Sequence, residues 1–82
     1  MGDYKFVEGE TMELIQAALA LKIRALRAEK GMSQKSLSMH TNVNKSYIYL
    51  LERGAANPTL QMLTKVAYAL GVDIVGLLAD LD

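Results

Sequence analysis

The chain has 82 residues, 51% of them apolar, with one proline and no cysteine. This length and composition indicate one small globular domain, and the missing cysteine excludes disulfides, thiolate metal sites and a cysteine nucleophile. The charges of nine basic and nine acidic residues cancel, so the chain is not uniformly basic. A nucleic-acid partner can therefore be indicated only by where the basic residues lie along the chain.

Residues 1–10 have no clear period, and we expect them to form an N-terminal arm. The arm either lies extended on the body or on a second subunit, or it is frayed, as chain ends often are. The segment is acidic where a signal peptide is basic, so export is not expected. The rest of the chain, residues 11–82, is expected to form a single domain.

A long helix is predicted from Thr11 to Lys30, because apolar residues recur at helical spacing among good helix formers. The longest unbroken apolar stretches, such as Ala17–Leu21, have five residues. They fall far short of the ~20 that cross a bilayer, so no membrane partner is expected. The apolar stripe is wider than a helix covered on one side requires. Its first half, with Leu14 and Leu21, packs within the monomer or contacts a second subunit, and we favour the second subunit.

The residues from Ser33 to Gly54 predict two short helices joined by a sharp turn. Ser33 is a cap for the first helix and Asn44 for the second. Asn42 tolerates the left-handed backbone that a sharp turn needs, and Gly54 ends the pair as a left-handed C-terminal cap. With the apolar Val43 inside the turn, this pattern is typical of a helix-turn-helix.

Two further helices are predicted after a connector at residues 55–58. The first follows the Thr59 cap and ends at Gly71. The second is short, from Ile74 to about Ala79, and so apolar that it must pack on the core, on a partner, or on both. Five helices and no strand result.

Basic charge gathers in the middle of the chain. Residues 22–65 hold eight lysines or arginines against two glutamates. Residues 1–21 hold one lysine against four acids, and residues 66–82 hold three aspartates alone. A local basic face is what phosphate contacts require, although a set of solvated lysines explains the same pattern about as well.

Several short groups occur together in a recognisable order and spacing: Gly31-Met32-Ser33-Gln34, Leu37, Val43-Asn44, Ile48, Glu52-Arg53-Gly54, Asn57-Pro58 and Leu70-Gly71-Val72. In these residues the chain resembles the lambda-repressor-like family, the Cro and repressor-type regulators also called the XRE family. The resemblance covers roughly residues 23–78. It implies an all-α, five-helix lambda-repressor-like DNA-binding domain with the helix-turn-helix at helices 2 and 3. Small one-domain members include phage-type repressors, restriction–modification controller proteins and autoregulating antitoxins.

The resemblance also implies roles for individual residues. The recognition helix, about Lys45 to Arg53, would lie in the major groove, where its first residues face base edges. Half-buried packing is the alternative for the two tyrosines of this helix. The implied base contacts are Lys45, Ser46, Tyr49 and Leu50, and the implied phosphate contacts are Gln34, Lys35, Asn44, Tyr47, Arg53 and Asn57.

Arg27 and Glu52 resemble the ion pair that holds two helices of this fold in register, and we favour this structural role over catalysis. The family pattern is not kept at every position, because Ser38, Thr41 and Asn42 replace residues the family prefers in the first helix and the turn. Each replacement is small or tolerant, but together they are expected to cost some stability.

No enzyme is expected, because the chain shows no glycine-rich phosphate loop and no paired-carboxylate cleft. His40 is the single histidine and has no second ligand at metal spacing, so neither a metal nor another cofactor is expected.

These patterns predict a sequence-specific DNA-binding transcriptional regulator, a repressor or controller that binds a palindromic operator in double-stranded DNA as a homodimer. Its expected location is the cytoplasm, associated with the nucleoid, as for a bacterial or phage-type regulator. RNA polymerase is a further expected partner if the protein activates transcription. The alternative is an antitoxin-like or other protein-interaction module that uses the same fold to bind a partner such as a toxin.

Overall fold

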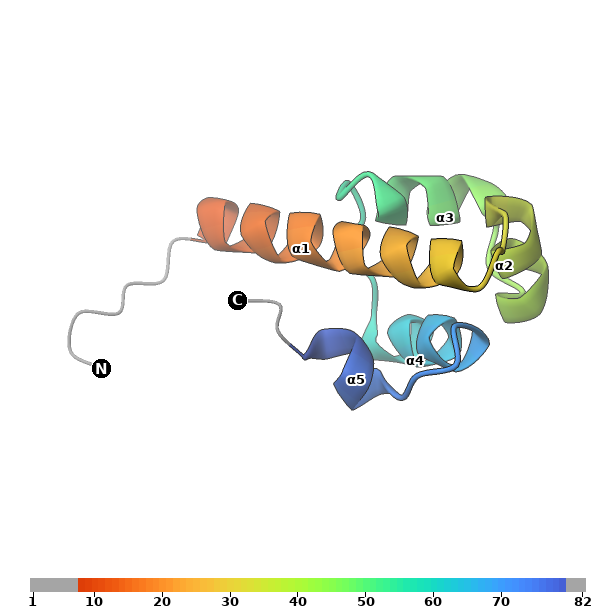
Figure 1. Ribbon diagram of the computed structural model, residues 1–82. Coiled ribbons are helices and arrows are strands. Elements are labelled where there is room, and N and C mark those ends of the chain that lie inside the picture. The colour runs from red at the N-terminus through yellow and green to blue at the C-terminus, as the bar shows by residue number, and fades with distance from the viewer. Residues whose placement is uncertain (1–7, 80–82) are drawn as a thin grey trace.

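The computed structural model describes residues 8–79, and these residues form five helices and no strand (Figure 1). The all-α, five-helix fold is therefore confirmed. The helices are α1 (Glu8–Glu29), α2 (Gln34–Thr41), α3 (Lys45–Glu52), α4 (Leu60–Ala69) and α5 (Ile74–Leu78). α1 begins before the expected Thr11, so residues 8–10 are helical. The remainder of the expected arm, residues 1–7, lies outside the described part of the chain.

Each of the four short helices begins with a polar side chain that accepts a backbone hydrogen bond from its first turn. The oxygens of Ser33, Asn44, Thr59 and Asp73 accept from amides two or three residues further on, at 3.0, 2.7, 3.1 and 2.6 Å. A helix start leaves amide donors without partners, and these caps satisfy one each. The positions at which α2 to α5 begin are thus set locally.

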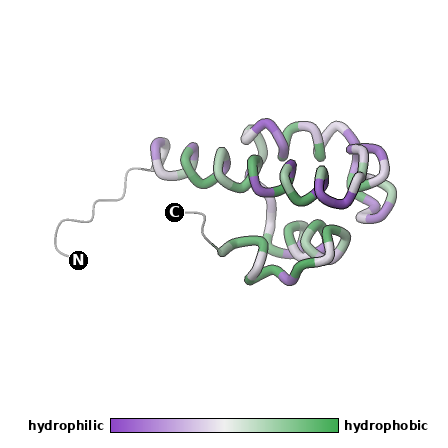
Figure 2. Tube along the Cα trace, viewed as in Figure 1, coloured by the Kyte–Doolittle hydropathy of each residue, from purple (hydrophilic) through white to green (hydrophobic). Residues whose placement is uncertain are grey.

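The helices pack around one apolar core. α3 lies against both α1 and α2, α4 lies against α2 and α5, and α5 returns to α1 (Figure 1). Every helix contributes to the core, and apolar stretches of α1, α4 and α5 are visible in Figure 2. Its buried members are Leu19, Ile23, Leu37, Val43, Ile48, Leu51, Ala56, Leu63, Val66, Ala67, Leu70 and Leu77.

α1 buries only part of its wide apolar stripe. Leu19 and Ile23 lie in the core, whereas Leu14 and Leu21 are 73% and 61% exposed. The N-terminal turns of α1 project beyond the other helices in Figure 1. Packing within residues 8–79 therefore does not cover the outer half of the stripe. Among the helices of residues 8–79, none combines the length and the hydropathy that a membrane span requires.

α5 divides its apolar residues between the core and the surface. Leu77 is fully buried, whereas Val75 is 73% exposed. Lys22 on α1 donates to the carbonyl of Ala79, just beyond α5, at 2.6 Å. This contact ties the end of the described chain back to α1.

Candidate nucleic-acid interface

The turn between α2 and α3 holds the two helices at a fixed angle. Asn42 has φ 58° and ψ 30°, the left-handed conformation that lets the chain reverse direction here. Val43 follows and is buried in the core. The Ser38 hydroxyl donates to the Val43 carbonyl, and the Thr41 hydroxyl accepts from the Val43 amide at 3.2 Å.

These bonds show how the unusual residues of the turn are accommodated. The buried Thr41 hydroxyl also donates to the carbonyl of Leu37 at 2.7 Å, so its capacity to donate and to accept is used. A buried hydroxyl with both bonds made does not carry the desolvation penalty of an unpaired one. Ser38 and Thr41 thus close the turn with hydrogen bonds. These bonds offset part of the stability cost that was expected because the two residues replace ones the family prefers.

Replacing Thr41 by valine is expected to lower the free energy of unfolding by about 1–3 kcal/mol, because the buried Val43 amide loses its acceptor. Urea denaturation measures the change. Thr64→Val is the matched control, because the Thr64 hydroxyl bonds the carbonyl of Leu60 on an exposed part of α4. The control should stay within about 0.5 kcal/mol of the parent protein. Equal losses in the two variants would contradict the role given to Thr41.

α3 has one buried face and one exposed face. Ile48, Leu51 and Glu52 are buried, at 0%, 2% and 3% exposure. The other face presents five exposed residues at helical spacing: Lys45, Ser46, Tyr49, Leu50 and Arg53, the last being the C-terminal cap of the helix. All four residues predicted to contact bases therefore share one surface that no other described part of the chain covers.

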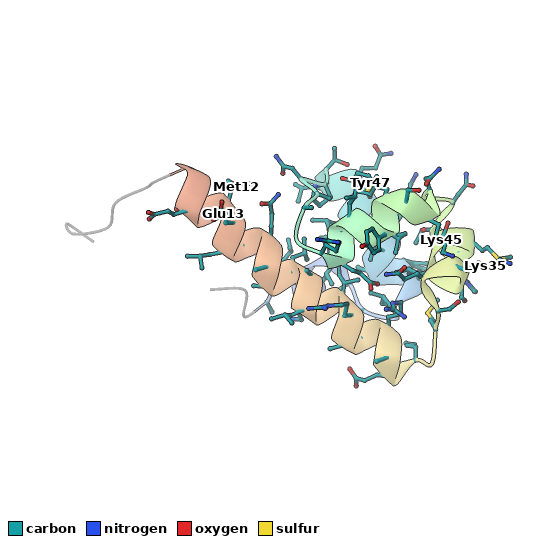
Figure 3. All side chains as sticks on the ribbon, turned by 90° about the horizontal axis from the view of Figure 1, so that it is seen from above. Met12, Glu13, Lys35, Lys45 and Tyr47 are labelled. Atoms are coloured by element: carbon teal, nitrogen blue, oxygen red, sulfur yellow. The ribbon has the colours of Figure 1, made fainter. Side chains whose placement is uncertain are left out.

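The N-terminal end of α3 borders a shallow open hollow of about 350 Å³ beside the start of α2. Gln34, Lys45, Ser46 and Tyr49 line it. Figure 3 shows Lys45 near Lys35 at the end of the molecule away from Met12 and Glu13. The hollow brings three predicted base-contacting residues together with one predicted phosphate-contacting residue.

The predicted phosphate-contacting residues lie in different environments. Lys35, Asn44, Arg53 and Asn57 are exposed, although the Asn44 carbonyl oxygen is used to cap α3. Tyr47 is half-buried and packs against the core, which is the alternative that the sequence left open for it. The phosphate contact assigned to Tyr47 stays a prediction.

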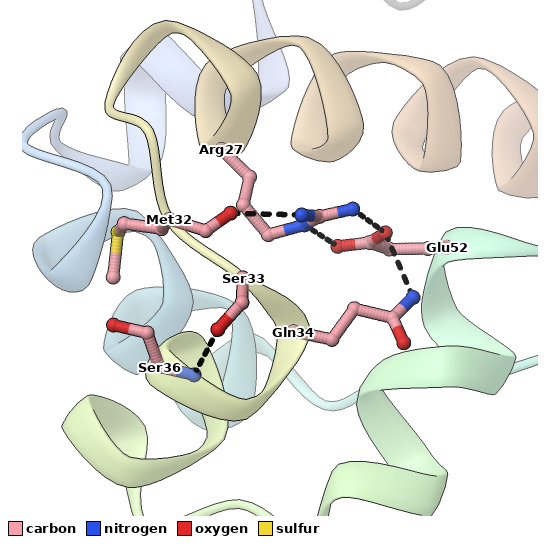
Figure 4. A network of polar contacts seen from close by, with 6 residues as sticks. All are labelled: Arg27, Met32, Ser33, Gln34, Ser36 and Glu52. Carbon is pink, nitrogen blue, oxygen red and sulfur yellow. Dashed lines mark hydrogen bonds and ion pairs between the residues drawn. The ribbon is translucent and has the colours of Figure 1, made fainter.

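Arg27 and Glu52 form an ion pair that joins α1 to the end of α3 (Figure 4). Arg27 Nε donates to Glu52 Oε2 at 2.7 Å, and a second guanidinium nitrogen donates to Oε1 at 2.8 Å. The same guanidinium donates to the carbonyl of Met32 at 2.8 Å, and Gln34 donates to Glu52 at 3.1 Å. Three segments, namely α1, the start of α2 and the end of α3, meet at this one carboxylate.

The hydrogen bond from Arg27 to Glu52 raises the pKa of the guanidinium above its ordinary value, against a smaller opposing effect of burial. A cation whose pKa is raised on folding stabilises the fold fully below its unfolded pKa, and the contribution is lost only as the pH rises through the folded pKa. For arginine both values are strongly alkaline. Arg27 therefore keeps its charge at all acidic, neutral and mildly alkaline pH values.

Two contacts that position the interface were not predicted. Gln16 on α1 donates to the carbonyl of Ala56 at 2.7 Å and so holds the loop that carries Asn57. Forty residues separate Gln16 from Ala56, and no sequence pattern links them. The second is the contact of Tyr49 with Arg53, in which Arg53 Nη1 donates to the tyrosine oxygen at 2.7 Å. Their spacing of four residues, one helical turn, was the available signal.

Within residues 8–79 no three histidine, cysteine or acidic side chains gather as metal ligands would. Every buried side-chain nitrogen or oxygen of the described part has a hydrogen-bond partner.

Comparison with known proteins identifies relatives of this chain. The chain is 40% identical over 57 residues to the uncharacterised HTH-type transcriptional regulator y4dJ of Sinorhizobium fredii, covering 70% of this chain and 74% of y4dJ. It is 36% identical over 59 residues to the control protein C.BamHI of Bacillus amyloliquefaciens, covering 71% and 73%. The immunity repressor of Bacillus phage phi105 is 34% identical over 59 residues, 72% of this chain but 41% of that protein.

Solved structures share the fold. The restriction–modification controller protein C.Esp1396I, as a tetramer in complex with its natural 35 base-pair operator, superimposes with a TM-score of 0.74 at 30% identity, covering 82% of this chain and 88% of that one. The helix-turn-helix family HTH_3 matches residues 23–77, from the C-terminal third of α1 to α5. The chain therefore belongs to this family of helix-turn-helix, XRE-type transcriptional regulators.

Proposed function

We propose that this regulator binds a palindromic operator as a homodimer, with α3 of each subunit in the major groove. One observation carries the proposal: within residues 8–79 nothing covers the outward face of α3, which bears Lys45, Ser46, Tyr49 and Leu50 at its exposed positions. In helix-turn-helix proteins the second helix of the pair lies in the groove and its N-terminal residues reach base edges. Support comes from C.Esp1396I, which is a tetramer on its own operator.

The chemistry of the four side chains suits base edges. A lysine donates to the O6 and N7 acceptors of guanine, a serine pairs with donors or acceptors, and a leucine contacts the thymine methyl. Lys35, Arg53 and Asn57 are exposed around this face, and together with Gln34, Asn44 and Tyr47 we assign them to the phosphates. The excess of basic over acidic residues in residues 22–65 supplies the local attraction.

A homodimer is proposed because one short helix reads few base pairs. Two subunits related by a two-fold axis place two such helices in successive major grooves, about 34 Å apart. The exposed apolar side chains of Leu14 and Leu21 on α1, of Tyr68 on α4 and of Val75 on α5 offer surface for the contact between subunits. Regulation then works by occupancy, either by blocking a promoter or by placing the protein beside RNA polymerase.

The proposal is tested by selecting operators from random duplexes with the full chain and measuring affinity by fluorescence anisotropy. We expect the selected sites to be palindromic and the protein to sediment as a dimer. The logarithm of the affinity should fall steeply with the logarithm of the salt concentration, because neutralised phosphates release counterions. No binding at low salt, together with co-purification of a second protein, would support the protein-interaction module instead.

Lys45→Ala is expected to weaken binding to the selected operator by about 1–3 kcal/mol and to relax the preference at one position of each half-site. Lys35→Ala is the matched control, because Lys35 is exposed nearby on α2 and is assigned to a phosphate. The control should weaken all sequences alike and lower the salt dependence by about one counterion per subunit. Anisotropy titrations against every single base-pair substitution distinguish the two patterns. An unchanged base preference in Lys45→Ala would contradict its assignment.

A further inference from the structure

Tyr49 and Arg53 form a pair on the exposed face of α3, and no other described residue bonds to either side chain. Arg53 Nη1 donates to the Tyr49 oxygen at 2.7 Å, and the guanidinium carbon lies 5.4 Å from the centre of the tyrosine ring. A residue spacing of four places both on the same side of the helix. Tyr49 remains 47% exposed, so the pair faces outward with the tyrosine accessible.

Arg53 has no competing acidic partner in the part of the chain that the structure describes. The neighbouring Glu52 is buried and accepts hydrogen bonds from Arg27 and Gln34. Among the side chains of residues 9–79, the Arg27–Glu52 contact is the single ion pair, so Arg53 forms none there. The guanidinium is held to Tyr49 both by the hydrogen bond and by its position at the aromatic ring. The Tyr49 ring is thereby restrained in one orientation without being buried.

The direction of this hydrogen bond determines what Tyr49 can offer a partner. An arginine has five donors and no acceptor, so the tyrosine oxygen must accept from it. The single hydroxyl hydrogen of Tyr49 is then directed away from Arg53 and is available to donate. Hydrogen bonds in a chain polarise one another, so a hydroxyl that accepts from a cation is a stronger donor.

Resting on the proposed function, we infer that Arg53 is a positioning residue that makes the Tyr49 hydroxyl a donor to one base acceptor in the major groove. Guanine, adenine and thymine each present an acceptor there, at N7 or O6, at N7, and at O4 respectively. Cytosine presents only its amino donor. The base that faces Tyr49 is therefore expected to be any base except cytosine, and Arg53 influences that preference without touching the base.

A double-mutant cycle on the selected operator tests the inference. Tyr49→Phe keeps the ring and removes the hydroxyl, and Arg53→Met removes the donor and the charge while keeping a long side chain. Loss of one hydrogen bond should weaken binding about 2- to 10-fold per half-site in Tyr49→Phe. The double variant should bind no more weakly than Arg53→Met alone, because Arg53→Met already removes the positioning of the Tyr49 hydroxyl together with the phosphate contact assigned to Arg53.

Base preference is the decisive measurement, because the loss of a positive charge alone does not change it. Tyr49→Phe and Arg53→Met are both expected to admit cytosine at the same single position of each half-site. Lys35→Met is the control for lost charge, and its effect should multiply with that of Tyr49→Phe and leave every base preference in place. Circular dichroism melting of all variants checks that these exposed substitutions leave the fold intact.

Two results would overturn the inference while leaving the proposed function standing. One is that the effects of Tyr49→Phe and Arg53→Met multiply, as for two independent contacts. The other is that Tyr49→Phe weakens all sequences equally, as expected if its hydroxyl donates to a phosphate. If the parent protein selects no operator at low salt, it is the proposed function that fails.

Discussion

Replacing Arg27 by methionine is expected to lower the free energy of unfolding by about 3 kcal/mol at neutral pH. The change leaves the Glu52 carboxylate, 3% exposed, with Gln34 as its one remaining side-chain partner, and it leaves the carbonyl of Met32 without its donor. Removing one partner of a buried pair typically costs about 3–5 kcal/mol, because an uncompensated charge stays buried. The arginine side chain is 21% exposed, which places the expectation at the lower end of that range.

Urea denaturation of three variants separates this effect from the loss of any surface arginine. Arg24→Met, on an exposed part of α1, should change the unfolding free energy by about 0.5 kcal/mol or less. The double variant with Arg27→Met and Glu52→Met should recover much of the loss, since an apolar pair of similar volume is often as stable as the ions. If Arg27→Met proves no less stable than Arg24→Met, the ion pair does not hold α1 to α3.

The residues that cap helices could be read from the sequence because their effect is local. Ser33, Asn44 and Thr59 each bond an amide two or three residues away, so the cap and its helix occupy one short window. The left-handed Asn42 is equally local. Arg27 and Glu52 are 25 residues apart. Their pairing was expected through the family resemblance, since spacing alone does not link them.

The orientation of α1 could not be predicted in the same way. Its apolar stripe is wider than one covered side requires, so the sequence left two alternatives for the first half, with Leu14 and Leu21: packing within the monomer, or the favoured contact with a second subunit. Contacts with α3 and α5 bury Leu19 and Ile23 and leave Leu14 and Leu21 exposed, and the contact with a second subunit stays a prediction. When an apolar stripe is wider than the side that is covered, the sequence does not predict which of its residues are buried.

The candidate interface was predicted as a set of separate roles, and the structure adds the connections between them. Tyr49 and Arg53 were assigned to a base and to a phosphate independently, yet they bond each other. Ser38 and Thr41 were read as deviations from the family pattern, yet both hydroxyls serve the turn. Side-chain bonds of this kind depend on rotamers, and residue type and spacing do not determine those.

Ile48→Ala is expected to lower the free energy of unfolding by about 2–5 kcal/mol, because the fully buried Ile48 side chain packs the middle of α3 against the core. Leu50→Ala, two residues further along the same helix, removes a similar apolar side chain from a site that is 42% exposed. It should change stability by about 0.5 kcal/mol or less. Urea denaturation measures both, and Ile48→Val, with an expected loss of about 0.5–1.5 kcal/mol, replaces Ile48→Ala if that variant does not fold.

Leu50→Ala and Ile48→Val should change places in rank when affinity for the selected operator is measured instead of stability. Leu50→Ala keeps the fold and removes a proposed apolar contact with a base, so its affinity should fall while its stability does not. Ile48→Val keeps the outward face of α3 and should bind almost as the parent protein does, provided that titrations are made where it is folded. This opposite ranking follows only if α3 presents Leu50 to DNA and Ile48 to the core. The reverse ranking would mean that α3 meets its partner with another face, and the assignments of Lys45, Ser46 and Tyr49 would fail with that of Leu50.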